Sequence, residues 1–314
     1  MRILAYNFQT FIRQLPATKR ALQLISLSYF TLLGNLLYAQ KQNHMAPQNP
    51  SPMTESIRPH ERIAPVDLPG KHLDLDVGLP YPAHLYLPDD EIRDSVSLLI
   101  HFHGPHEIAD HAIKNKIHWA ALTINLGSGS SAYSRPFDQS DAFGQLLTVT
   151  EKAIQNPIKA IYLSGWSAGY GAIRSILKQE SHPKMDGVIL LDGMHAGYIP
   201  KNQTLATGAK IKEEDLAVFL SLSHEAMKEN ISFTFTHSSV FPGTYASTTE
   251  CADYLIHKLQ LERNPVLNHG PLGMQQLADN HVGKLRIKAF AGNSAPDHID
   301  HLHALFYFLE ELTR

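Results

Sequence analysis

From about residue 70 onward, short apolar runs alternate with longer stretches in which apolar residues recur every three or four positions. The short runs are bounded by Gly, Pro or charged residues, as buried strands are. They predict strands over 71–78, 83–88, 95–104, 118–127, 159–165, 186–193, 231–240 and 284–292. The first two alternate apolar and polar residues and flank a Pro-rich turn, which is typical of a β-hairpin at a sheet edge.

The longer stretches have helical spacing and lie between the predicted strands. They predict helices over 140–154, 170–180, 213–229, 251–261 and 297–314. Strands that alternate with helices of this length form βαβ units, so we expect an α/β fold with a mostly parallel central sheet flanked by helices. In such a sheet the functional site lies at the carboxyl ends of the strands. The loops over 193–212, 241–250 and 262–283 are long enough to act as lids or substrate walls.

The first 39 residues have the pattern of an export signal. Residues 1–20 hold four basic residues and no acidic one, residues 21–39 carry no charge, and Ala39 precedes a polar run. This order is that of a secretory signal peptide and predicts a secreted or periplasmic protein. The alternative is an uncleaved signal anchor that tethers the protein to a membrane through residues 21–39, because about 17–25 apolar residues can span a bilayer.

Residues 40–68 follow as a Pro-rich segment with few apolar residues. This composition predicts a flexible, extended tether without a core of its own. Residues 69–314 then remain for a single catalytic domain.

Composition narrows the class of protein further. With 43% hydrophobic and 18% charged residues, the chain is neither disordered nor a polytopic membrane protein. Its one cysteine, Cys251, excludes a disulfide framework and a Cys-rich zinc module. The net charge of −3 becomes −7 if residues 1–39 are removed, since 27 basic residues become 23 against 30 acidic ones. Neither value favours binding to nucleic acid.

The sequence Gly-Trp-Ser-Ala-Gly at 165–169 stands between a predicted strand and a predicted helix. In this strand–turn–helix context the Gly-x-Ser-x-Gly motif holds a tight turn that exposes the serine hydroxyl above the sheet and aims the helix N-terminus at it. Ser167 is therefore the candidate nucleophile. A serine hydroxyl is a poor nucleophile by itself, so it needs an adjacent base and an acid that orients the base.

With this motif, the chain resembles the α/β-hydrolase superfamily of serine esterases and lipases over roughly residues 70–314, including the chain order Ser…Asp…His. The resemblance implies the α/β-hydrolase fold and a Ser-His-Asp triad that needs no cofactor. It implies no particular substrate.

The base is expected in the loop after the last predicted strand, where His298, His301 and His303 compete. His298 lies nearest the strand end, where the family places its catalytic histidine. His301, one helical turn further, is the alternative base. His303 is expected on the surface or in packing.

The acid departs from the usual family position. The superfamily usually places it after the strand predicted over 231–240, but no Asp follows that strand closely. Asp192 ends the preceding apolar strand, a position that some family members use, and a buried carboxylate there needs a partner. Asp192 is therefore the candidate acid, with a simple turn cap as the alternative.

The oxyanion hole needs two N–H donors. One is expected at Ala168, the residue after the nucleophile. The other is expected near Gly104, because His103-Gly104 matches the family's His-Gly pair. Pro105 follows here and has no N–H, so Gly104 or His106 must donate.

Three aromatic side chains are candidates for the substrate pocket. Trp166 and Tyr170 flank the nucleophile, and His103 follows a strand end. Plain packing is the alternative interpretation of the first two.

Two other functions fit some of the same residues. His101, His103 and the C-terminal histidines could form the site of a metal-dependent hydrolase, because His-x-His after a strand is a common ligand arrangement. A non-catalytic binding protein of this fold is the second alternative. The motif and the resemblance together favour an exported serine hydrolase that cleaves a carboxylic ester, small or polymer-borne, through an acyl-enzyme.

Overall fold

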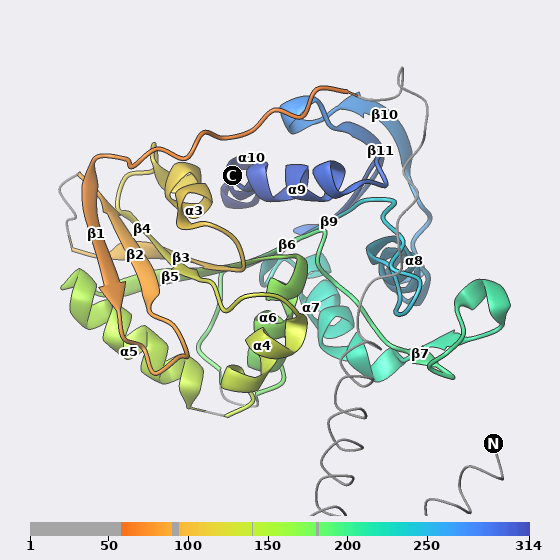
Figure 1. Ribbon diagram of the computed structural model, residues 1–314, viewed down its shortest axis with the longest axis horizontal. Helices are drawn as coiled ribbons and strands as arrows, with labels where there is room; N and C mark the ends of the chain where they lie inside the picture. The colour runs from red at the N-terminus through yellow and green to blue at the C-terminus, as the bar shows by residue number, and fades with distance from the viewer. Residues whose placement is uncertain (1–57, 90–93, 140, 180–181) are drawn as a thin grey trace, which may run out of the picture. The chain divides into compact units, whose positions relative to one another are not determined.

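The computed structural model describes residues 58–89, 94–139, 141–179 and 182–314 (Figure 1). All of these belong to one compact unit, Pro47–Arg314. The predicted leader, 1–39, and the first part of the predicted tether, 40–57, lie outside the described residues. Within the described ranges, none of the helices combines the length and the apolar character that crossing a bilayer requires.

A ten-stranded sheet in the order β1-β2-β4-β3-β5-β6-β9-β12-β11-β10 organises the domain (Figure 1). Its central strands from β4 to β12 are parallel, and an antiparallel pair flanks them at each edge. The strands are β1 (Gly70–Leu75), β2 (Ala83–Pro88), β3 (Val96–Phe102), β4 (Trp119–Ile124), β5 (Ile158–Trp166), β6 (Gly187–Leu191), β9 (Ser232–His237), β10 (Pro265–His269), β11 (Gln275–Val282) and β12 (Leu285–Phe290). A separate short pair comprises β7 (Tyr198–Ile199) and β8 (Lys210–Ile211).

Helices cover both faces of this sheet (Figure 1). They are α3 (His106–Ile113), α4 (Ser130–Ser134), α5 (Ala142–Ile154), α6 (Tyr170–Leu177), α7 (Ala217–Met227), α8 (Thr248–Lys258), α9 (Ala295–His303) and α10 (Leu305–Thr313). One apolar core packs α5, α6, α7 and α8 against the sheet, with Phe143, Ile173 and Phe219 among its buried side chains. A second core packs α3 and α10 against the opposite face, around Ile108, Leu305 and Phe308.

The expected α/β fold is therefore confirmed. The sheet is mostly parallel, helices flank it, and an edge hairpin formed by β1 and β2 precedes it, as the alternating pattern predicts. The Gly-x-Ser-x-Gly turn lies between β5 and α6, near the middle of the sheet.

Several elements differ from the sequence-based expectation, among them the short helix α4 and the short strands β7 and β8. Residues 262–283, expected as a loop, form the antiparallel strands β10 and β11. The inward positions of β11 include Gln276 and Asn280, so hydropathy shows no alternation there. Helix α3 was not expected either, and the final helix is broken at Ala304 into α9 and α10.

The last part of the predicted tether packs against the domain. Residues 58–68 run along the surface past α9 and α3 to β1 (Figure 1). Ile63 and Leu68 are partly buried against the second core, and the Ile63 N–H donates to Nδ1 of His303 at 3.0 Å. Residues 58–68 are therefore held on the domain by a few apolar and charged side chains.

Candidate active site

The turn after β5 holds Ser167 in a left-handed backbone conformation, with φ of 46°. Glycine is required at two positions around it. A Cβ at Gly169 would lie 2.1 Å from the carbonyl oxygen of Phe102, and one at Gly193 would lie 2.5 Å from that of Ser167. Both approaches are too close for any side chain. The ends of β3, β5 and β6 therefore meet at the serine.

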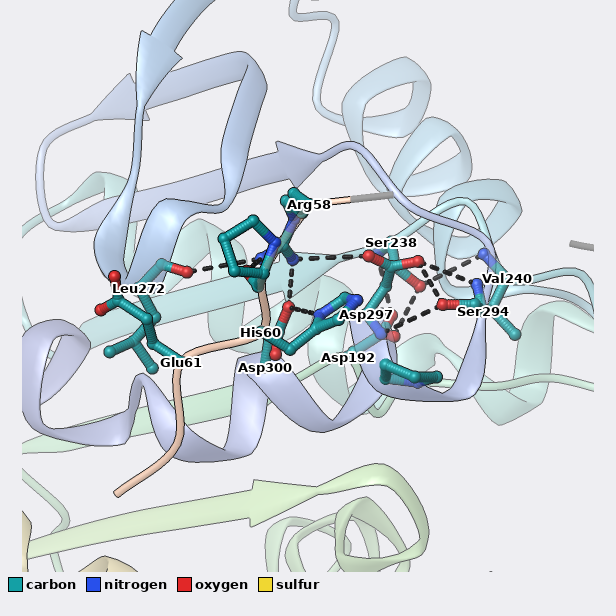
Figure 2. Close-up of polar contacts among 12 residues, drawn as sticks. Arg58, His60, Glu61, Asp192, Ser238, Val240, Leu272, Ser294, Asp297 and Asp300 are labelled. Atoms are coloured by element: carbon teal, nitrogen blue, oxygen red, sulfur yellow. Dashed lines mark hydrogen bonds and ion pairs between the residues drawn. The ribbon is translucent and has the colours of Figure 1, made fainter. Parts of the chain in front are cut away.

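Asp192 follows β6 and is buried. Its carboxylate accepts four hydrogen bonds: 2.9 Å from Ser238 N–H, 2.6 Å from Ser238 Oγ, 2.6 Å from Thr248 Oγ1 and 2.7 Å from His298 Nδ1. Figure 2 shows Asp192 beside Ser238. A buried carboxylate with this many donors is compensated rather than stranded.

These donors also favour the charged form of Asp192. Burial by itself would raise the pKa of Asp192, but the adjacent His301 and His298 outweigh it and hold that pKa well below the ordinary carboxyl value. Asp192 is consequently an anion at neutral pH. Because a carboxylate only accepts, His298 must carry its hydrogen on Nδ1, which leaves the Nε2 lone pair available.

His298 is held in place from two sides. It lies in the first turn of α9, which begins with a capping box between Ser294 and Asp297. The ring of Trp166 contacts the His298 ring with centroids 4.8 Å apart, and Trp166 Nε1 donates to the His298 carbonyl at 3.0 Å. Since Trp166 immediately precedes Ser167, this contact brings the histidine to the serine turn.

The structure thus joins Asp192 and His298 directly and brings both to the Ser167 turn. Among the described residues, no hydrogen bond links the Ser167 hydroxyl to His298. In enzymes that pair a nucleophile with a base, the hydrogen bond between the two is often long before substrate binds.

His301, the alternative base, occupies a different environment. It is buried, and its Nδ1 lies 2.7 Å from Thr236 Oγ1. Burial lowers the pKa of His301 to about 4, so it is neutral under physiological conditions. No hydrogen bond from His301 to Asp192 occurs among the described residues. This geometry favours His298 over His301 as the partner of Asp192.

The proposed oxyanion donors lie on adjoining segments. Ala168 belongs to the short helical turn that follows β5, and Gly104 follows β3, whose end lies against that turn. Gly104 has φ of 131° and lies directly before Pro105 and α3. The backbone N–H of His103 is bonded to the carbonyl of Ile124 at 3.0 Å, so this N–H is not available to an oxyanion.

The three candidate substrate-contacting side chains differ in exposure. Trp166 is half-buried, and its ring lies between those of His298 and His103, whose centroid is 4.9 Å away. His103 Nδ1 lies 2.8 Å from the hydroxyl of Tyr133, and burial lowers the pKa of His103 to about 4. Tyr170 is part of the buried core, so packing is its main role.

Backbone strain also concentrates at this site. His103, Ser167 and Asp192 have φ values of 74°, 46° and 42°, and each directly follows a strand end. Non-glycine residues in this conformation cost about 1–3 kcal/mol each and cluster at functional sites. Three neighbouring strands therefore present strained polar residues at the same edge of the sheet.

The arrangement suggested for a metal-dependent hydrolase does not assemble. His101 is fully buried in β3, with its Nδ1 2.5 Å from Ser164 Oγ, while His103 lies beyond the strand and shares no face with it. Over the described ranges, the groups able to hold a metal ion contain neither histidine and neither His298 nor His301.

Sequence patterns gave no sign of several supporting residues. Ser238 and Thr248 lie far from Asp192 in the chain. Ser238 lies directly after β9, where the superfamily usually has its acid, and donates to the acid of the neighbouring strand instead. The only sequence feature that could have indicated this role is the polar residue Ser238 at the end of a predicted strand.

A second buried carboxylate supports α9. Asp300 accepts hydrogen bonds from Arg58 and Arg62, and His60 Nδ1 lies 2.8 Å from its Oδ2. Figure 2 shows Arg58 and His60 converging on Asp300. Because Asp300 is two residues from His298, this contact fastens the helix that carries the histidine.

Comparisons with known proteins identify distant structural neighbours. No protein-family model matches the chain, and no curated protein matches it in sequence. A poly(3-hydroxybutyrate) depolymerase from Bordetella parapertussis is 11% identical, over 73% of this chain and 84% of that one, with a TM-score of 0.45. An acetyl xylan esterase from Aspergillus awamori is 10% identical, over 76% and 100%, with a TM-score of 0.44. A carboxylesterase from Bacillus subtilis is 9% identical, over 80% and 90%, with a TM-score of 0.41. Likenesses this remote assign no substrate.

Proposed function

We propose that this protein is a serine hydrolase that cleaves a carboxylic ester through an acyl-enzyme. The observation that carries the proposal is the 2.7 Å hydrogen bond between Asp192 and His298 beside the strained turn of Ser167. The proposed acid, base and nucleophile come from three separate segments of the chain. An ordinary turn between a strand and a helix has no structural need for this group of residues, so their convergence favours a catalytic role.

The reaction follows from the roles of these groups. Ser167 Oγ attacks the ester carbonyl carbon while His298 Nε2 takes the hydroxyl proton. N–H groups of Ala168 and of the Gly104 loop stabilise the negative oxygen of the tetrahedral intermediate. His298 then gives the proton to the departing alcohol, which leaves Ser167 acylated. Water, activated by His298, hydrolyses this ester and regenerates the enzyme. Asp192 stabilises the imidazolium throughout.

Covalent labelling tests the nucleophile directly. The purified protein is expected to react with a fluorophosphonate probe at Ser167 and to hydrolyse p-nitrophenyl esters. Ser167→Ala is expected to abolish labelling and to lower kcat by about 10⁴-fold or more. Peptide mass spectrometry of the labelled protein identifies the modified residue.

Ser221→Ala provides a matched control, because Ser221 is an exposed serine of α7. It should label and turn over as the wild type does. A folded protein that neither labels nor hydrolyses any ester in an array would instead support a non-catalytic binding role. Activity that is lost with a chelator but never labels Ser167 would support a metal-dependent hydrolase.

We also propose that the protein is exported. The basic and apolar pattern of residues 1–39 supports export, with a membrane anchor through residues 21–39 as the alternative. An exported hydrolase could meet small or polymer-borne esters outside the cytoplasm.

A further inference from the structure

A group of three histidines and one aspartate lies apart from the proposed active site, at the edge hairpin. His72 comes from β1 and His84 from β2, while His106 and Asp110 come from α3. One ligand atom from each residue lies within 4.8 Å of each of the others. Figure 1 shows α3 beside the β1–β2 hairpin. Three elements therefore bring potential metal ligands to one point.

Local geometry accounts for this meeting. His106 and Asp110 are one helical turn apart, so they share a face of α3. In the antiparallel register, Tyr86 pairs with His72 and His84 with Asp74, which makes His72 and His84 diagonal neighbours on one face of the hairpin. The histidines remain partly exposed, so an ion can reach them from solvent.

The separations between these atoms match a tetrahedral zinc site. Ligands at about 2.0–2.1 Å from a tetrahedral zinc ion lie roughly 3.3 Å from one another. His72 Nδ1 and His84 Nε2 are 3.1 Å apart. Asp110 Oδ2 is 3.9 Å from His72 Nδ1, 3.7 Å from His84 Nε2 and 2.8 Å from His106 Nδ1. These four distances bracket the tetrahedral value.

The outward nitrogens of the three rings also have the partners that metal-bound histidines have. His72 Nε2 lies 2.9 Å from the Leu68 carbonyl oxygen, which can only accept. His84 Nδ1 faces the Asp74 carboxylate at 3.5 Å, and His106 Nε2 faces that of Glu107 at 4.0 Å. The Leu68 carbonyl places the hydrogen of His72 on Nε2, and the nearby carboxylates would attract the outer N–H of His84 and of His106 when an ion occupies the inner nitrogens.

This assignment leaves lone pairs facing one another. If the outer nitrogens carry the hydrogens, His72 Nδ1 and His84 Nε2 both present lone pairs toward the Asp110 carboxylate. Lone pairs about 3 Å apart repel unless a cation lies between them. The same groups are joined by hydrogen bonds here, His72 Nδ1 with His84 Nε2 at 3.1 Å and His106 Nδ1 with Asp110 Oδ2 at 2.8 Å, and a cation would replace the shared hydrogens.

One carboxylate oxygen of Asp110 can still accept a hydrogen bond or bind a cation. The residue is 2% exposed, and its buried Oδ1 has no hydrogen-bond partner within the described part of the chain. A buried carboxylate with an unsatisfied oxygen is costly unless positive charge compensates it. A divalent cation would supply that charge at the point where the three histidines converge.

We propose that His72, His84, His106 and Asp110 bind one divalent transition-metal ion, and that Zn²⁺ fits best. Three imidazoles and one carboxylate suit zinc, and the stacked rings of His84 and His106, with centroids 3.8 Å apart, would turn to direct both nitrogens at the ion. Four protein ligands close the coordination sphere, so the ion has a structural role and activates no water. The site shares no residue with the proposed triad, and the proposal does not rest on the esterase activity.

The ion joins the edge hairpin to the start of α3. Only Pro105 separates His106 from Gly104, the expected oxyanion donor. Holding His106 therefore also fixes the path of the chain as it leaves the proposed active site. Because Zn²⁺ would bind the folded state, it raises the thermal stability of the domain.

Zinc titration of the full-length purified protein tests this proposal. After dialysis against EDTA and removal of the chelator, calorimetric titration with ZnCl₂ should give one ion per chain, with a rise in Tm. Asp110→Asn and His72→Gln should each weaken Zn²⁺ binding by at least about 100-fold, since even outer-shell changes cost roughly 10–100-fold. His269→Gln, at an exposed histidine of β10, should bind as the wild type does.

A second measurement does not depend on variants. Co²⁺ loaded into the wild type should give the intense visible absorption of a tetrahedral site, and Zn²⁺ should displace it. A weak octahedral spectrum, or Zn²⁺ binding that persists unchanged in Asp110→Asn, would overturn the proposal. So would a wild-type protein that binds no Zn²⁺. Fluorophosphonate labelling of Ser167 reports separately on the hydrolase proposal.

Discussion

At the scale of single residues, the carboxylate of Asp192 depends on hydrogen bonds from side chains that are distant in the sequence. Asp192, the proposed acid, follows β6, whereas Ser238 follows β9, the position at which an acid is first expected from the sequence. The carboxylate still lies within reach of His298, because neighbouring parallel strands end at the same edge of the sheet. Ser238 and Thr248 then satisfy the carboxylate oxygens that the histidine does not use.

Removing these two hydroxyl groups should destabilise the domain at neutral pH. In Ser238→Ala/Thr248→Val, the Asp192 carboxylate keeps only the Ser238 N–H and His298 as donors. Hydrogen bonds to charged groups contribute about 1.5–3 kcal/mol each, so a loss of that order per bond is expected in the free energy of unfolding. Urea denaturation at pH 7 measures it.

The pH dependence of this loss has a definite sign. The pKa of Asp192 is depressed in the folded protein, so its contribution is complete above the unfolded-state pKa of about 3.9. It disappears as the pH falls through the lower folded-state pKa. The difference between variant and wild type should therefore shrink in acid. The control Ser239→Ala, at an exposed neighbour, should cost little at any pH. A loss that is independent of pH would contradict this account.

At the scale of elements, α9 is more than the carrier of His298. The helix also carries the buried Asp300, which accepts hydrogen bonds from Arg58 and Arg62 in a segment more than two hundred residues earlier in the chain. Sequence patterns marked that segment as part of a tether, because Pro and polar residues dominate it. Its attachment depends on a partner that the local sequence does not contain.

Loss of both arginines should weaken this attachment strongly. Arg58→Gln/Arg62→Gln leaves the fully buried Asp300 with His60 as its remaining contact among these three side chains, and burial lowers the pKa of His60. Leaving a buried charge without its partner costs about 3–5 kcal/mol, so urea denaturation should show a decrease of that size in the free energy of unfolding. We also expect a lower kcat/KM, because α9 carries His298 and would be held less firmly. Adding Asp300→Asn should restore part of the stability, because it removes the stranded charge.

A surface ion pair serves as the matched control for this experiment. Arg263 pairs with Asp253, whose side chain is 58% exposed. Arg263→Gln should change stability by only about 0–1 kcal/mol. Equal losses from both experiments would mean that the Asp300 contact has no special importance.

Elements could be predicted from the sequence where one physical signal dominated. Central strands such as β3 and β6 are apolar throughout because helices cover both faces. The sequence did not predict β11, because its inward positions include the polar residues Gln276 and Asn280. Their side chains are satisfied by hydrogen bonds within the protein, so the strand lacks the usual alternation of apolar and polar residues. The sequence did not predict α3 either, because the polar residues His106 and Asp110 on one of its faces are also typical of a loop.

At the scale of the whole molecule, removal of the predicted leader changes the charge of the protein. If residues 1–39 are cleaved, the native chain begins at Gln40 and its net charge is −7. N-terminal sequencing of protein from the native host checks this, and extraction with detergent distinguishes the anchored alternative. A native protein that begins at Met1 and stays in the cytoplasm would contradict export.

The sequence by itself determined the fold class and singled out Ser167 as the proposed nucleophile, because both depend on local patterns. Hydrophobic periodicity reports which faces are buried, and the Gly-x-Ser-x-Gly turn is continuous in the chain. Only the tertiary structure decided which acid meets His298 and which hydroxyl groups support it. It alone brought His72 and His84 to α3, because contacts between distant segments follow from strand order and packing, which no local pattern encodes.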